Sequence, residues 1–367
     1  MSYPMKKELT CPYHPNNIGQ FFGNSHYIIP ILAFSLVAAL RWNVGSDTQS
    51  YMSLFYVLSD IKVEIGFDLL RQFWLRIGGS HIPLFFCLAL LEVGPIYYAL
   101  KKQPGVLSFY PIFFVLTGHF WDYNNAVRQT IAFGCFVVIT ILLSEKKYYK
   151  AVIMVVIASL FHRSAWVMIP LSLIFFRPVD FYRSRVVQLI IVAIAYLLSG
   201  FGVTNGIANA AEVFLTFIGY DEYENHLLDV IMEMNFGFRM NLLLTANVIV
   251  ILISDKLKKY YNSPHFTIIY NIYFTGFVLY ILFFANLGLA RFLWYLYAFM
   301  PIIMGYAAWY LYKNRKTNSG LIQYALPLMV VLLLMRTGYD LWEAMHLPDN
   351  EDMKLYKFIF GRTLKFY

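Results

Sequence analysis

The residue types best suited to chemistry begin directly after the first hydrophobic segment, where Arg41 opens a polar stretch that runs to Tyr51. Asp47 lies inside this stretch, and Glu64 follows shortly after it. A carboxylate can remove a proton from a hydroxyl group, and an arginine holds phosphate through its planar fork of N–H donors. The structural alternatives are a helix cap for Asp47 and a salt bridge to an arginine for Glu64.

Two further arginines stand at the beginnings of later hydrophobic segments. Arg128 and Gln129 occupy the first turn of one such segment, and Arg291 the start of another. The free amides of a helix N-terminus also attract anions. Charges at this depth are costly and usually mark function, although pairing with Asp122 or Asp47 is the structural alternative.

The elements that position these residues are membrane-spanning helices. Hydrophobic residues make up 59% of the chain, charged residues only 14%, and the mean hydropathy is +0.57, which exceeds what a soluble core requires. In a bilayer such long apolar runs must satisfy their backbone by forming helices. The sequence therefore predicts an all-α polytopic membrane protein with about nine to ten transmembrane helices. The expected spans lie near residues 27–42, 82–100, 105–121, 126–144, 185–203, 239–254, 266–285, 290–312 and 321–338.

The segment 151–176 does not fit a single crossing, because basic residues on both of its flanks favour the cytoplasmic side. We expect a re-entrant helical hairpin with His162 at its tip. His162 is then a candidate base, or a hydrogen-bonded staple of the hairpin.

The predicted organisation is a single membrane domain flanked by two polar ends. We expect outer-face amphipathic segments in its two external loops. The second loop is rich in acidic and aromatic residues, so it could contact sugars or pack on the bundle as a lid. The expected parts are a cytoplasmic arm over 1–26, the membrane domain over 27–338 with external loops at 43–80 and 204–238, and an external tail over 339–367.

Arginine and lysine are unequally divided between the two predicted sides. Lysines outnumber arginines three to one on the inner side, whereas arginines outnumber lysines two to one on the outer side. Arginine binds phosphate bidentately and keeps its charge. The reversal favours an external phosphate or pyrophosphate ligand, although single arginines can also snorkel to headgroups or pair with carboxylates.

Five short motifs, in order over about residues 25–300, resemble the EpsG-type Wzy polymerases of bacterial polysaccharide assembly. They are LRWNVGSDTQSY at 40–51, EIGF at 64–67, VRQ at 127–129, SLFHRSA at 159–165 followed by Ile169-Pro170, and ARF at 290–292. Two departures stand out: a polar arm replaces the span that commonly precedes the first motif, and EIGF stands where an acidic-Pro-Gly sequence is frequent.

The resemblance implies a multi-pass inner-membrane enzyme that polymerises undecaprenyl-pyrophosphate-linked repeat units at the outer face, in exopolysaccharide or O-antigen biosynthesis. It implies no metal and no cofactor. Carried over by position, the catalytic candidates are Asp47, Glu64 and His162, and the candidates for binding pyrophosphate or glycan are Arg41, Tyr51, Arg128, Gln129 and Arg291.

Two other functions remain open at this point. A flippase for lipid-linked oligosaccharide would also place arginines around a cavity, and a membrane acyltransferase could use His162 as its base. The partners implied for a polymerase are the lipid-linked glycan and membrane lipid, with a chain-length regulator and a flippase left open. Nucleic acid is not among them.

Overall fold

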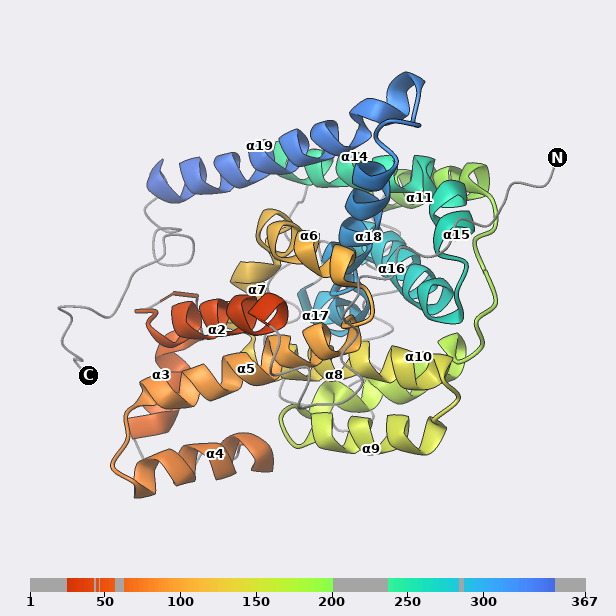
Figure 1. Cartoon of the computed structure of the whole chain (residues 1–367). Helices are drawn as coiled ribbons and strands as arrows, with labels where there is room; N and C mark the ends of the chain where they lie inside the picture. The colour runs from red at the N-terminus through yellow and green to blue at the C-terminus, as the bar shows by residue number, and fades with distance from the viewer. Residues whose placement is uncertain are drawn as a thin grey trace.

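The computed structural model describes residues 25–42, 44–45, 47–56, 63–200, 237–283 and 287–346. Within these ranges every regular element is a helix and no β-strand occurs, which confirms the all-α fold class (Figure 1). In chain order the elements are α2 (Ser25–Ala39), α3 (Thr48–Tyr56), α4 (Ile65–Arg76), α5 (His81–Ala99), α6 (Pro104–Leu116), α7 (His119–Asn125), α8 (Val127–Ser144), α9 (Tyr148–Ser159), η1 (Arg163–Val167), α10 (Met168–Phe175), α11 (Arg185–Gly200), α14 (Phe238–Leu252), α15 (Ser254–Tyr261), α16 (Pro264–Phe283), α17 (Leu287–Tyr297), α18 (Met300–Lys313), η3 (Gly320–Tyr324) and α19 (Ala325–His346).

In the part of the chain that the structure describes, five helical stretches are long and apolar enough to cross a membrane. They are α5, α8, α16, Phe292–Lys313 and Gly320–Glu343. The pair α14 and α15, bent by 54°, forms a sixth if it is one span. The other expected spans coincide with the shorter apolar helices α2, α6 and α11. The chain is therefore an all-α polytopic membrane protein.

The middle of the bundle is formed by α8 and by the stretch Phe292–Lys313. In an 18-residue window of each, 72% and 78% of the residues are buried, compared with only 17% in Gly320–Glu343. The last helix, α19, thus lies at the periphery beside α14 (Figure 1). Helix α5 packs closely on α8, because a Cβ atom at Gly134 would come within 2.6 Å of the Glu92 carbonyl oxygen. Small residues permit such close backbone approach between membrane helices.

The expected hairpin is present as α9, η1 and α10. The two helices run antiparallel, because Tyr148 at the start of α9 meets Phe176 just after the end of α10, with ring centroids 6.4 Å apart. Their outward faces are apolar and exposed, as at Ile153 and Leu173. The chain reverses at residues 160–162, so His162 lies at the tip, where the sequence placed it.

The ion pairs of the described residues can be sorted by the side of the membrane that the basic loops predict for their helix ends. None of them joins an end predicted inside to an end predicted outside. Ends predicted inside are joined by Lys102–Glu145, Lys147–Glu145, Arg185–Asp255 and Lys258–Asp180, and ends predicted outside by Arg71–Asp68, Arg128–Glu64, Arg239–Asp340 and Arg336–Asp340. His162–Glu64 joins the hairpin tip to the predicted outer loop.

Two expected spans differ in extent. The helix expected over 321–338 continues to His346 as α19, into the segment predicted as the tail. The span predicted over 105–121 ends at Leu116, because the backbone turns at Gly118, whose φ of 87° lies in the left-handed region that glycine adopts without strain. A separate short helix, α7, follows at His119. The described residues of the loop 43–80, which we predict to be external, form the helices α3 and α4. The arm 1–24, most of the 204–238 loop and the tail from 347 lie outside the described residues.

Candidate functional site

Segments from three of the sequence motifs converge on Arg128 in the first turn of α8. Its Nη1 atom donates to the Glu64 carboxylate, which immediately precedes α4. The rings of Tyr51 from α3 and Phe67 from α4 lie 5.7 and 5.8 Å from the guanidinium carbon. Aromatic rings at this distance attract a cation through their quadrupole. The arginine is thereby held by a carboxylate and two rings.

The tip of the α9–α10 hairpin reaches the same carboxylate. The Nδ1 atom of His162 lies 3.3 Å from Glu64 Oε1, and the backbone N–H of Arg163 donates to that oxygen over 3.3 Å. The N–H of Gly66 donates to the Leu160 carbonyl over 2.7 Å. A Cβ atom at Gly66 would lie 2.8 Å from that carbonyl oxygen, so this close contact explains the glycine of the EIGF motif. Glu64 therefore connects α8 to the hairpin.

The surroundings of Glu64 keep it ionised. Burial opposes the charged form, but the polar contact with His162 and the charge of Arg128 outweigh burial and lower the Glu64 pKa from 4.5 to about 2. A general base works best when its pKa is near the operating pH. Glu64 therefore suits the positioning of Arg128 and His162 better than proton removal at neutral pH.

Helix α7 holds the first motif in place through two consecutive asparagines. The Oδ1 atom of Asn124 accepts a hydrogen bond from Arg41 Nη1 over 3.2 Å, and the Oδ1 atom of Asn125 accepts one from the Asp47 backbone N–H over 3.0 Å. Arg41 is only 1% exposed, and its guanidinium lies 4.5 Å from the ring centroid of Phe85. In this structure Arg41 is positioned to support the first motif from within the bundle.

The remaining predicted residues lie near this cluster or outside the described part. Gln129 follows Arg128 in α8 and is buried. Arg291 belongs to α17, which packs beside α8, but its side chain lies outside the described residues. Of the structural alternatives, the salt bridge of Glu64 with an arginine is realised, whereas Arg128 pairs with Glu64 instead of Asp122 or Asp47.

Sequence reasoning missed two parts of this region. Asn124 and Asn125 stand shortly before Arg128 in the chain, but their contacts with the first motif depend on the break at Gly118, which the sequence did not predict. Arg239 and Arg336 were counted among the outer arginines, yet nothing in their spacing showed that one carboxylate, Asp340, joins them.

The fold and the site define a polytopic helical membrane protein in which an arginine, a carboxylate and a histidine meet at one end of the bundle. The chain belongs to the EpsG family, whose model matches residues 24–346 and so includes every residue of this cluster. Membership indicates a membrane-associated polysaccharide polymerase of glycosyltransferase-like activity at the level of the family. No curated protein and no solved structure matches the chain.

Proposed function

We propose that this protein polymerises undecaprenyl-pyrophosphate-linked oligosaccharide repeat units at the outer face of the bacterial inner membrane. The observation that carries the proposal is the meeting of Arg128 and Glu64, which we predict to lie outside, with His162 at the hairpin tip; the three come from separate motifs. An oligosaccharide pyrophosphate offers what this cluster can act on, namely an anionic leaving group beside sugar hydroxyls.

Arg128 is the group that binds the pyrophosphate of the donor chain. Its Nη1 atom is engaged by Glu64, and 26% of the side chain remains exposed. A guanidinium has five N–H donors, so a second oxygen ligand can be accommodated. Fixed positive charge at the point where negative charge develops lowers the barrier of a transfer reaction. Arg291 is a further candidate for this role, whereas Arg41, which the sequence also suggested, is buried and supports the first motif.

His162 is the base that we favour for the acceptor hydroxyl. The Glu64 carboxylate beside Nδ1 favours the tautomer that carries its proton on Nδ1, which leaves Nε2 as a proton acceptor. This is the arrangement of a base oriented by a carboxylate. Asp47 remains the alternative base, because its backbone is fixed by Asn125 at the start of α3.

The transfer balances without a further reactant. The hydroxyl oxygen of the incoming unit attacks the anomeric carbon of the donor chain, and its proton passes to Nε2 of His162. The bond between that carbon and the pyrophosphate oxygen breaks, and undecaprenyl pyrophosphate leaves with the electron pair, stabilised by Arg128. The chain grows at its reducing end.

The test is to delete the gene, restore it with defined variants and measure surface glycan length by gel. Wild type should restore a full ladder, and Arg128→Ala should leave single repeat units because the leaving pyrophosphate is no longer stabilised. Arg76→Ala is the matched control: it removes the same charge from the same predicted side, but Arg76 is exposed and its only described hydrogen bond goes to Gln72. This control should restore the ladder.

Other outcomes would redirect the assignment. Full-length glycan in the deletion strain would overturn the proposal, and full-length but unmodified chains would indicate an acyltransferase. The absence of any surface glycan would indicate a transporter. A full ladder with Arg128→Ala present at wild-type levels in the membrane would remove Arg128 from the reaction.

A further inference from the structure

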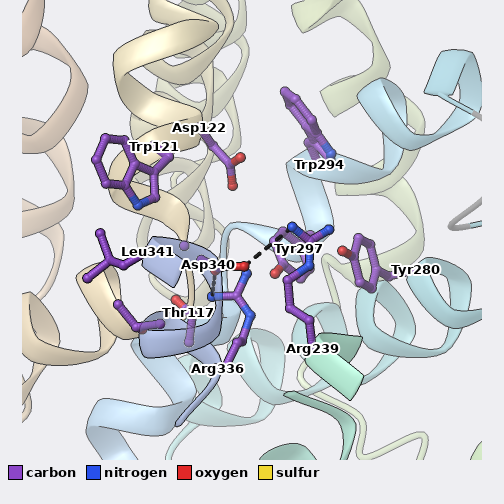
Figure 2. Close-up of a pocket in the computed structure, with 12 residues that line it drawn as sticks. Thr117, Trp121, Asp122, Arg239, Tyr280, Trp294, Tyr297, Arg336, Asp340 and Leu341 are labelled. Carbon is purple, nitrogen blue, oxygen red and sulfur yellow. Dashed lines mark hydrogen bonds and ion pairs between the residues drawn. The ribbon is translucent and has the colours of Figure 1, made fainter. Parts of the chain in front are cut away.

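A second polar site is separate from the cluster of Arg128, Glu64 and His162, which we call the Arg128 cluster. It lies in a pocket of about 210 Å³ between α6–α7, α14, α16, α17 and α19 (Figure 2). It combines large aromatic rings with both signs of charge. We call it the tryptophan pocket; its lining includes Trp121, Asp122, Arg239, Tyr280, Trp294, Tyr297, Arg336 and Asp340.

The charges of the tryptophan pocket nearly balance. Asp340 pairs with both arginines, at 3.4 Å from Arg239 Nη1 and 3.5 Å from Arg336 Nη1. Asp122 adds a second carboxyl, for which the described residues provide neither an ion pair nor a side-chain hydrogen bond, and Figure 2 shows it apart from the bridged group. A pyrophosphate would have to displace Asp340 and approach Asp122. The charge pattern therefore favours a neutral, hydroxyl-rich ligand over an anion.

Two of the aromatic residues that line the pocket are not stacked on another described ring. Tyr297 is stacked between His119 and Tyr280, with ring centroids 4.5 and 4.4 Å away, so it serves as a packed wall. Trp294 makes no ring contact with a described residue, and the described ring contact of Trp121 is edgewise. Figure 2 shows these two tryptophans on opposite sides of Asp122. Aromatic faces beside carboxylates and guanidinium groups suit the C–H faces and hydroxyls of a sugar ring.

The position of the pocket relates it to the Arg128 cluster. Helix α7 carries Trp121 and Asp122 toward the pocket, while its asparagines contact the first motif. Asp122 precedes Arg128 by six residues, so their Cα atoms are at most ~20 Å apart at ~3.3 Å per residue. An oligosaccharide of a few sugars spans such a distance. The pocket is also smaller than the ~300–1,000 Å³ clefts that enclose drug-sized ligands, which suits one ring.

We propose that the tryptophan pocket binds one sugar ring of the lipid-linked oligosaccharide while its pyrophosphate lies at Arg128. The proposal rests on the proposed function, because it names the part of the same substrate that this second site holds. Trp294 and Trp121 stack on the ring, and Asp122 accepts hydrogen bonds from its hydroxyls. The pocket thus positions the glycan without taking part in the transfer.

The test uses the purified full-length protein in detergent and two probes in calorimetric titrations. The first probe is the repeat-unit oligosaccharide released from the surface glycan of the producing strain, and the second is inorganic pyrophosphate. Trp294→Ala should weaken oligosaccharide binding on the order of tenfold, the change that ~1.4 kcal/mol produces. Trp294→Phe should retain most of the affinity because it keeps an aromatic face. Pyrophosphate binding should not change in either variant.

Trp342→Ala is the matched control, because this tryptophan lies on α19 near the pocket but is 51% exposed and does not line it. It should bind the oligosaccharide as wild type does. Equal affinity of wild type and Trp294→Ala, or no oligosaccharide binding by wild type, would overturn the proposal. The polymerase assignment is decided separately by the glycan ladder, since these titrations do not depend on turnover.

Discussion

Replacing Glu64 by glutamine should destabilise the protein at neutral pH, and the size of the effect follows from the surroundings of the carboxylate. The side chain is 11% exposed, and its pKa falls from 4.5 to about 2 because its contacts with His162 and Arg128 outweigh burial. At ~1.4 kcal/mol per unit of pKa shift, the charged form of Glu64 contributes about 3 kcal/mol to the free energy of unfolding. With an unfolding entropy of ~2.1 cal/mol/K per residue, Glu64→Gln should lower the unfolding midpoint by about 4 °C.

The sign of the pH dependence is fixed by the lowered pKa. The contribution of Glu64 is complete above pH 4.5 and is lost as the pH falls through the folded-state pKa of about 2. The difference between wild type and Glu64→Gln should therefore be constant near neutral pH and should close between pH 4.5 and 2. The measurement is thermal unfolding of the purified proteins in detergent across this range.

Glu145→Gln is the control for this experiment, because Glu145 also pairs with a basic residue, Lys147, but at an exposed inner loop. Exposed pairs contribute ~0–1 kcal/mol, so this variant should shift the midpoint by about 1 °C or less. A Glu64→Gln midpoint within 1 °C of wild type at neutral pH would refute the reasoning. So would a difference that persists unchanged at pH 2.

Two further predictions concern the packing around the cluster. Gly66→Ala should lower the free energy of unfolding by ~1–3 kcal/mol, because its new methyl group meets the Leu160 carbonyl oxygen. Gly94→Ala meets no atom within 4 Å and should raise the free energy of unfolding by up to ~1 kcal/mol through its higher helix propensity. Thermal unfolding of both variants measures this, and equal midpoints would contradict the contact. Arg41→Lys should shorten the glycan ladder although the charge is kept, because lysine lacks the planar group that lies over Phe85; a ladder of wild-type length would show that charge alone suffices.

The sequence by itself determined the class of the protein, the approximate positions of its helices and the hairpin. These follow from local physics: apolar runs in a bilayer must become helices, and basic flanks on both sides of the 151–176 segment forbid a single crossing. The sequence also selected Arg128, because a charge at the end of an apolar helix is costly to place there. It selected Glu64 as a carboxylate close to the first polar stretch and His162 as the residue at the hairpin tip.

Only the tertiary structure decided which of these groups meet and what each can do. Glu64 and Arg128 are 64 residues apart, and their pairing depends on how α4 and the hairpin pack on α8, which no local pattern encodes. The same packing lowers the Glu64 pKa and so favours positioning over proton removal. The break at Gly118 turns α7 between the Arg128 cluster and the tryptophan pocket. Distances between chain segments depend on packing, whereas the identity of a span depends on its own side chains.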